Sequence, residues 1–150
     1  MSDHLYFMLL AYNEALKAFE INETPIGCII VYNENIIGQA YNMRNTAKNV
    51  LCHAEISAIN QACAAMGDWR LEGCRLYVTL EPCAMCAGAI VQARIDEVIY
   101  GAPNPKAGCA GSILNILSEP RFNHQTRIVG GVMEAECSRL MSVFFKRFRT

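Results

Sequence analysis

The sequence lacks an excess of charge of either sign. Its 150 residues carry 13 Lys and Arg against 14 Asp and Glu, which gives a net charge of -1, and the isoelectric point is about 6.3. This balance lacks the basic excess typical of nucleic-acid-binding domains, so composition alone favours an enzyme for a small molecule. With 53% hydrophobic and 18% charged residues, the chain is not a disordered tail, a collagen-like fibre or a mucin-like stalk.

We also expect no segment for export or membrane insertion. Residues 5–12 form an apolar run as long as a signal-peptide core, but Asp3 precedes it and no Lys or Arg comes before Lys17. No run approaches the ~18 apolar residues of a membrane span. We therefore expect a soluble, cytoplasmic protein whose eight cysteines are reduced thiols.

No repeat, linker or low-complexity tract divides the chain, so we expect one domain over residues 1–150. Strands alternate with helices, which indicates an α/β fold with a largely parallel sheet between helices on both faces. In such folds, sites lie beyond the carboxyl ends of the strands. Apolar spacing predicts helices over 3–20, 54–66, 83–93, 112–117 and 134–148. It predicts strands over 27–32, 75–80, 98–100 and 127–133, with a hairpin return at 36–37.

Two short motifs contain residue types that suit metal chemistry. One is His53-x-Glu55, and the other is Pro82-Cys83-x-x-Cys86; each lies where a predicted helix opens. One His and two Cys suit Zn²⁺ in a tetrahedral site, and three protein ligands leave the fourth position for water. The partial positive charge of a helix N-terminus favours the thiolate forms of the two cysteines.

Glu55 lies two positions after the His, so it can share the cavity without binding the metal. Zinc lowers the pKa of its bound water toward ~7, which makes hydroxide available at neutral pH. A carboxylate beside it can take a proton from the water and deliver it to the substrate and the leaving group. The two motifs together match the known signature of zinc nucleobase deaminases, in which hydroxide attacks C4 of cytosine or C6 of adenine.

Other interpretations of these residues remain open. His53, Cys83 and Cys86 could form a structural zinc site with Cys52 as the fourth ligand, although this leaves Glu55 without a role. The two motif cysteines could instead form a thioredoxin-like redox pair, which ignores the His. The remaining six cysteines are expected to be small core residues. No Gly-rich phosphate-binding motif occurs, so we expect no nucleotide cofactor.

With these motifs, the chain resembles the bacterial tRNA-specific adenosine deaminase family over nearly its whole length. Relatives that act on free cytosine, cytidine or guanine share the metal motif. The Asn123-His124 pair and an aromatic and basic carboxyl-terminal helix favour the tRNA branch. The resemblance implies a three-layer α/β/α, cytidine-deaminase-like fold with a mixed, largely parallel five-stranded sheet. Besides the two motifs, the likeness includes Glu23–Gly27, Asn42, Lys106–Ser112, Phe122–His124 and Phe144–Arg149.

The resemblance also implies a reaction: hydrolytic deamination of adenosine to inosine at the wobble position of a tRNA anticodon. In this reaction zinc-activated hydroxide attacks adenine C6, with Glu55 as the proton shuttle. The resemblance implies one Zn²⁺ per subunit, held by His53, Cys83 and Cys86, in a homodimer that takes the tRNA anticodon stem-loop as its partner. It implies substrate contacts from Asn42, Asn104, Asn123, Phe145 and Arg149.

The carboxyl-terminal segment suits RNA for its own reasons. Aromatic faces stack on bases and basic residues attract the backbone of a single strand. Phe144 and Phe148 are spaced to share the core face of a helix, so Phe145 points elsewhere and suits a ligand. The alternative is an ordinary amphipathic helix with solvated basic residues. No acid lies among these basic positions: Arg139, Lys146, Arg147 and Arg149; Lys106 and Arg121 are expected to extend the basic surface.

The chain departs from the family pattern at two places. Residues 50–52 replace a common Pro-Thr-Ala, which leaves the thiol of Cys52 beside the zinc His. Asn104 stands where Asp is common, and an amide can both donate and accept hydrogen bonds without charge. We hypothesise that Asn104 relaxes the preference for RNA over DNA, because the 2′-OH separates the two.

Two other functions remain open at this point. A deaminase of a free base or nucleoside would need the same metal motif. A non-catalytic RNA-binding module with structural zinc would keep the motif but never release ammonia. Deamination of a bare anticodon stem-loop, but not of free adenosine, cytidine or guanine, separates the two enzymes. Substitution of Glu55 separates an enzyme from the binding module, since only an enzyme loses turnover when the proton shuttle is removed.

Overall fold

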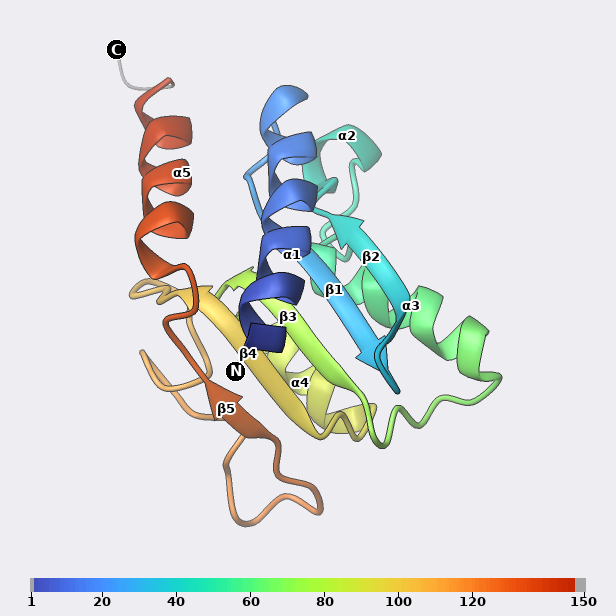
Figure 1. Cartoon of the computed structure of the whole chain (residues 1–150). Helices are drawn as coiled ribbons and strands as arrows, with labels where there is room; N and C mark the ends of the chain where they lie inside the picture. Colours follow the sequence, from blue (N-terminus) through green and yellow to red (C-terminus); the bar gives the residue numbers. More distant parts are fainter. Residues whose placement is uncertain (1, 148–150) are drawn as a thin grey trace.

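The computed structural model describes residues 2–147 of the chain, and of Ser2 only the backbone (Figure 1). Within this part the strands form one sheet in the order β2-β1-β3-β4-β5. The strands are β1 (Gly27–Tyr32), β2 (Asn35–Tyr41), β3 (Arg75–Leu80), β4 (Glu97–Ala102) and β5 (Arg127–Val129). The helices are α1 (Ser2–Glu20), α2 (Arg44–Ala47), α3 (Ala54–Met66), α4 (Ala84–Gln92) and α5 (Glu134–Lys146).

The sheet is mixed, as predicted. β1 pairs antiparallel with both β2 and β3, whereas the β3–β4 and β4–β5 pairs are parallel. The hairpin between β1 and β2 turns through Asn33 and Glu34, which both have positive φ angles of 48° and 64°. Two consecutive residues of this kind match the right-handed twist of the flanking strands. Half of the strand pairs are therefore parallel, and β1 is the strand that makes the sheet mixed.

The sheet has a hydrophobic core on each of its two faces, because successive side chains of a strand point to opposite faces. Cys28 and Ile30 belong to the core beneath α3 and α4, whereas Ile29 and Val31 belong to the core beneath α1. Figure 1 shows α1 and α5 in front of the sheet and α3 and α4 behind it. The predicted three-layer arrangement is confirmed. At Gly27, α1 lies so close that a Cβ would overlap its backbone.

Most predicted elements are found, and the misses have local causes. The predicted helix over 112–117 is wrong: this segment is an irregular loop, closed by a bridge between Ala110 and Asn115. The predicted strand over 127–133 ends at Val129, because two glycines follow and Gly131 has a φ of 87°. The short helix α2 was not predicted, since four residues carry no periodicity.

Some expectations for single residues also change. Cys28, Cys74, Cys109 and Cys137 are buried as expected, but Cys52 and Cys63 are partly exposed. All eight cysteines are free thiols. His4 is half-buried, and its Nδ1 lies 2.8 Å from the Tyr77 hydroxyl. Among the described helices none has the length and hydropathy needed to cross a bilayer.

The direction of β1 decides where the loops gather. Because β1 runs against β2 and β3, its amino end lies at the same edge as the carboxyl ends of β2, β3 and β4. The segments that meet there are residues 23–26, 42–53, 81–83 and 103–112. This edge is where the sequence predicts the site.

Candidate active site

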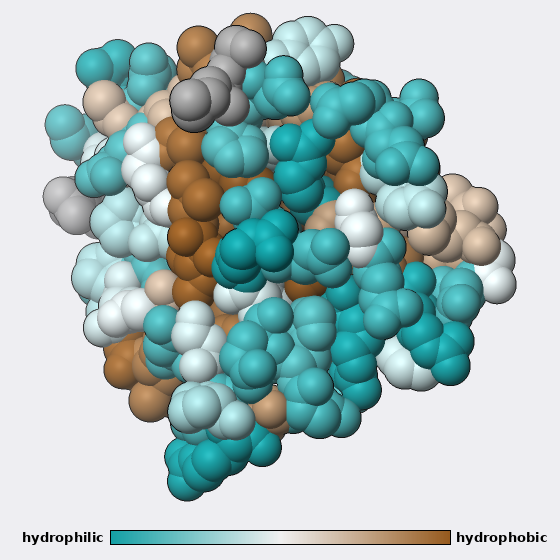
Figure 2. Space-filling model, turned by 60° about the horizontal axis from the view of Figure 1, so that its bottom comes forward, coloured by the Kyte–Doolittle hydropathy of each residue, from teal (hydrophilic) through white to brown (hydrophobic). Residues whose placement is uncertain are grey.

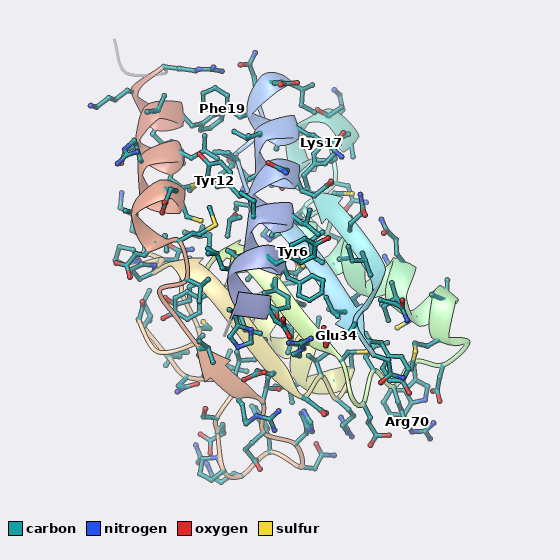
Figure 3. All side chains as sticks on the ribbon, viewed as in Figure 1. Tyr6, Tyr12, Lys17, Phe19, Glu34 and Arg70 are labelled. Atoms are coloured by element: carbon teal, nitrogen blue, oxygen red, sulfur yellow. The ribbon has the colours of Figure 1, made fainter. Side chains whose placement is uncertain are left out.

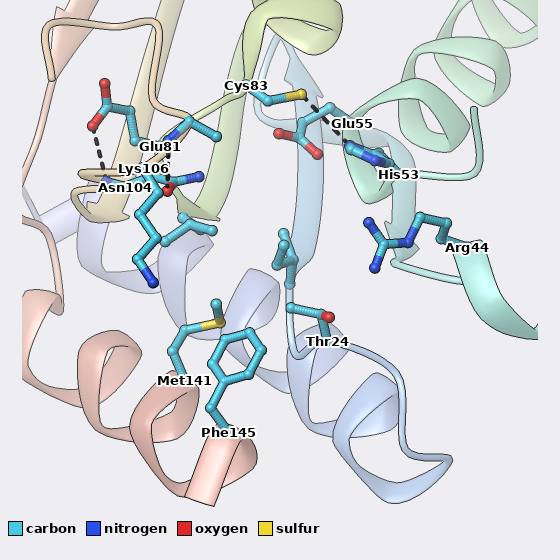
Figure 4. Close-up of a pocket in the computed structure, with 13 residues that line it drawn as sticks. Thr24, Arg44, His53, Glu55, Glu81, Cys83, Asn104, Lys106, Met141 and Phe145 are labelled. Atoms are coloured by element: carbon cyan, nitrogen blue, oxygen red, sulfur yellow. Dashed lines mark hydrogen bonds between the residues drawn. The ribbon is translucent and has the colours of Figure 1, made fainter. Parts of the chain in front are cut away.

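A cavity of about 630 Å³ opens at this edge of the sheet (Figure 4). Its wall on one side is α2 and the segment before β1, and on the other the loop after β4. Figure 4 shows Met141 and Phe145 of α5 opposite Cys83, Glu55 and His53. The lining residues are Thr24, Ile26, Arg44, His53, Glu55, Leu80, Glu81, Cys83, Asn104, Lys106, Ala107, Met141 and Phe145.

The structure brings His53, Cys83 and Cys86 together at the first turns of two helices. His53 directly precedes α3, Cys83 directly precedes α4, and Cys86 lies in the first turn of α4. The Nδ1 atom of His53 is 3.7 Å from the Cys83 sulfur and 3.5 Å from the Cys86 sulfur. A tetrahedral zinc ion with ordinary bond lengths would separate such N and S atoms by about 3.5 Å, so the three side chains fit Zn²⁺.

Within residues 2–147 this is the one group of His, Cys and acidic side chains close enough to share a metal ion. Cys52 is not part of it. The interpretation with Cys52 as a fourth ligand therefore has no support in the geometry. Three ligands and an open side toward the cavity are the arrangement of catalytic zinc sites.

Hydrogen bonds within the cluster favour a thiolate. A hydrogen bond with Cys86 lowers the pKa of Cys83 to about 4, and the hydrogen bond with His53 acts in the same direction. The same interactions raise the pKa values of Cys86 and of His53. A cysteine binds metal as the thiolate, so Cys83 is held in the form that a metal ion requires.

Glu55 lies in the first turn of α3 and is only 4% exposed. Burial raises the pKa of its carboxyl to about 7, and the neighbouring Cys83 adds to this shift. Figure 4 shows the carboxylate beside Cys83 and His53, facing the cavity. An acid with a pKa near 7 can both accept and donate a proton at neutral pH, which is what general acid–base catalysis requires.

The residues predicted to contact the substrate do not all line the cavity. Asn104 and Phe145 line the cavity; Phe145 is 47% exposed, while its neighbour Phe144 is 4% exposed, as the helical spacing predicts. Asn42 is buried beside the cavity, and its amide nitrogen lies 3.5 Å from both Glu23 Oε1 and the Thr24 carbonyl oxygen. Asn123 is exposed in the loop before β5, outside the cavity lining. Arg149, like Phe148, lies outside the described residues.

The basic residues are likewise not all available to a ligand. Arg147 donates hydrogen bonds to Asn22 Oδ1 (3.1 Å) and the Phe19 carbonyl oxygen (3.4 Å), and it stacks on the Phe19 ring. Figure 3 shows Phe19 directed from α1 toward α5. Arg121 pairs with Glu119 at 2.9 Å. Arg147 therefore links the end of α5 to α1. Of the predicted basic residues within 2–147, Lys106 lines the cavity.

Sequence reasoning missed three residues that shape the cavity. Arg44 lines it from α2, and the buried carboxylates Glu23 and Glu81 lie at its two sides. Burial acts to raise the pKa of both carboxyls, but their hydrogen bonds outweigh it and lower each pKa on balance. The sequence offered one signal for the two carboxylates: Glu23 and Glu81 each lie within two positions of a proline (Pro25 or Pro82) next to a strand.

The fold matches that of solved deaminases. A structure from biochemical and structural studies of A-to-I editing by tRNA:A34 deaminases at the wobble position of transfer RNA superimposes with a TM-score of 0.86. It is 42% identical and covers 90% of this chain and 98% of its own. A guanine deaminase from Nitrosomonas europaea shares the fold at a TM-score of 0.73 and 16% identity, over 91% of this chain and 81% of its own. The architecture is thus that of the cytidine-deaminase-like class.

Sequence comparison narrows this class. The family described as MafB19-like deaminase matches residues 1–149. A tRNA-specific adenosine deaminase of Bacillus subtilis (strain 168) is 52% identical over 98% of this chain and 91% of its own length. One of Aquifex aeolicus (strain VF5) is 46% identical over 96% and 95%. The chain belongs to the tRNA-specific adenosine deaminase family.

If His53, Cys83 and Cys86 hold the zinc ion, the zinc content of the protein should depend on Cys83 and not on Cys52. Replacing Cys83 with Ser removes a ligand from a three-ligand site, so purified C83S protein is expected to hold almost no zinc, against about one ion per chain in the wild type. Cys52→Ser changes the thiol next to His53 but not the cluster, and is expected to keep full zinc. Elemental analysis of the two variants decides between the three-ligand site and the site with Cys52, since equal loss in both would support the latter.

Proposed function

We propose that the protein hydrolytically deaminates adenosine to inosine at the wobble position of a tRNA anticodon. The observation that carries this proposal is the placement of a buried Glu55 beside the His53, Cys83 and Cys86 cluster, inside a cavity open to the surface. Membership of the family supports the reaction. A tRNA substrate would place the activity in the cytoplasm.

In this proposal His53, Cys83 and Cys86 hold one zinc ion per subunit. When bound, zinc acts as a Lewis acid that lowers the pKa of water toward ~7, so that a nucleophile is available at neutral pH. Glu55 accepts a proton from the attacking water and delivers it to the amino group that leaves as ammonia. Because the carboxyl is buried and its pKa is raised to about 7, it can return the proton it has taken.

The cavity is suited to a base that has left its stack. Met141 and Phe145 offer an apolar side against which a base can lie, while Arg44 and Lys106 flank the opening on opposite sides (Figure 4). Single-stranded RNA is recognised by this combination of stacking surfaces and positive charge along the backbone. The further contacts proposed for the anticodon loop are Asn42, Asn104, Asn123 and Arg149.

The proposal includes a homodimer. Large apolar side chains are exposed on this chain, among them Leu114 at 57% and Phe122 at 48%. Figure 2 shows an apolar strip on a face that is otherwise largely hydrophilic. Contiguous apolar surface of this kind is typical of sites that another protein covers.

The reaction is tested with a bare anticodon stem-loop that carries adenosine at the wobble position. We expect inosine to form in the stem-loop and not from free adenosine, and cytidine and guanine to stay unchanged. Glu55→Gln is expected to keep zinc and RNA binding but to lose about 10²–10⁴-fold in turnover, because the proton shuttle is removed. Nucleoside analysis by mass spectrometry gives the rates, and sedimentation of the same preparation should show twice the 16.7 kDa chain.

Other outcomes would support other functions. Deamination of a free base or nucleoside alone would support a small-molecule deaminase. Tight RNA binding with no release of ammonia by wild type or Glu55→Gln would support a binding module with structural zinc. Sedimentation as a monomer at micromolar concentration would refute the homodimer and leave the reaction standing.

The side chain of Asn104 is expected to affect the preference for RNA over DNA. Its side-chain oxygen accepts a hydrogen bond from the Ala107 N–H (3.2 Å), which a carboxylate could also accept. Asn104→Asp therefore keeps the turn but adds a negative charge that accepts hydrogen bonds only. We expect the ratio of inosine formation in matched RNA and DNA hairpins to rise several-fold in N104D, because 2′-OH recognition separates the two. An unchanged ratio would contradict a role for Asn104 in this preference.

A further inference from the structure

Two separate segments hold the cations that flank the cavity. Arg44 lies at the start of α2, and Lys106 lies in the loop over residues 103–112 that follows β4. Figure 4 shows these side chains on opposite sides of the cavity. Both are exposed, so neither is fixed by burial. Their positions depend on what holds the backbone of each segment.

The loop over residues 103–112 is folded around the carboxylate of Glu81, which is 1% exposed. Oε1 accepts hydrogen bonds from the Asn104 N–H (3.0 Å) and the Ser112 hydroxyl (2.5 Å). Oε2 accepts from the N–H groups of Ala110 (2.9 Å) and Ser112 (3.0 Å). These donors come from both ends of the loop, so the Glu81 carboxylate joins the beginning of the loop to its end.

The loop approaches this carboxylate so closely that only glycine fits at residue 108. A Cβ there would overlap the Glu81 carboxylate and the Asn104 carbonyl group. The Gly108 N–H also donates to that carbonyl oxygen (2.8 Å), which closes the turn that carries Lys106. Lys106 is thus held by a turn that is itself attached to Glu81.

The opposite wall has its own carboxylate. Glu23 is also 1% exposed and accepts hydrogen bonds from the N–H groups of Asn45 (3.2 Å) and Thr46 (2.5 Å) in α2. Among the hydrogen bonds of the described residues, none joins Glu23 or its partners to Glu81 or its partners. The two walls are therefore held independently, which provides a matched control.

We propose that Glu81 is a positioning residue for substrate RNA: it fixes the wall that carries Asn104 and Lys106 and thereby sets the affinity for the RNA. Both of its oxygens are occupied by donors from the loop, so it is not available as a proton acceptor for the reaction. This inference rests on the proposed function only for the identity of the ligand. Its effect is expected on binding and not on the chemical step, because the wall contacts RNA outside the reacting base.

A Glu81→Gln substitution releases one contact in particular. The Ser112 hydroxyl can turn to accept a hydrogen bond from the new amide, but the N–H groups of Ala110 and Ser112 need an oxygen. The amide nitrogen is therefore expected to face Asn104, whose N–H then has no acceptor. Losing a charge-assisted hydrogen bond of this kind should raise KM for the stem-loop about tenfold, with kcat within about twofold.

The kinetic test is a pair of double-mutant cycles. If Glu81 acts through its own wall, Lys106→Ala adds less than about twofold to KM once Glu81→Gln is present. Arg44→Ala, on the opposite wall, should multiply with Glu81→Gln in full. Ser112→Ala removes one donor and leaves the Asn104 bond, so its KM should stay within about twofold of the wild type. Full multiplication in both cycles, or an unchanged KM for Glu81→Gln, would overturn the proposal.

Amide hydrogen exchange tests the same proposal without any activity. Glu81→Gln should speed exchange over residues 104–112 about tenfold and leave residues 42–47 unchanged, and Glu23→Gln should do the reverse. If Glu81→Gln does not fold, Gly108→Ala displaces the same carboxylate without removing its charge. Unchanged exchange over 104–112 refutes the positioning role. If the wild type makes no inosine but the exchange pattern holds, the proposed function fails while the attachment of the wall by Glu81 stands.

Discussion

The site depends on the antiparallel placement of β1 between β2 and β3. This placement brings the amino end of β1 to the edge where β2, β3 and β4 end. The helices α3 and α4 both begin at that edge, with His53 and Cys83 as the residues directly before them. Two helix N-termini then face one cavity, and their partial positive charge favours the anionic forms of the groups between them. A parallel β1 would send the segment before it to the far edge.

Three buried glutamates at this edge differ in pKa because their hydrogen-bond donors differ. Glu23 accepts two backbone N–H groups from α2, and Glu81 accepts three from the loop over residues 103–112. The pKa of each carboxyl is lowered despite burial. For Glu55 burial outweighs the hydrogen bonds it accepts, and its pKa is raised to about 7. The first two stay charged and hold the walls, whereas the third can exchange a proton. The same side chain thus serves structure or chemistry according to its donors.

The sequence predicts the metal motifs and most of the helices and strands, but it does not predict the irregular loop beside the site. Residue type and spacing are enough for His53, Glu55, Cys83 and Cys86, since metal chemistry admits few alternatives. Helical periodicity also separates Phe144 from Phe145 correctly. The irregular segment over 103–117 escapes such reasoning, because its shape does not come from local preference. Long-range hydrogen bonds to Glu81 hold residues 104–112, and a bridge between Ala110 and Asn115 closes the rest. The availability of Arg147 could not be predicted either, because its contacts with Phe19 of α1 join residues that are far apart in the sequence.

The most direct test of the central claim is nucleoside analysis of total tRNA after incubation with the purified protein. If the cluster, Glu55 and the flanking walls act together on an anticodon loop, inosine should appear at the wobble position of a tRNA that carries adenosine there. It should not appear elsewhere in the tRNA pool. Absence of inosine from a zinc-loaded, folded preparation would contradict the account.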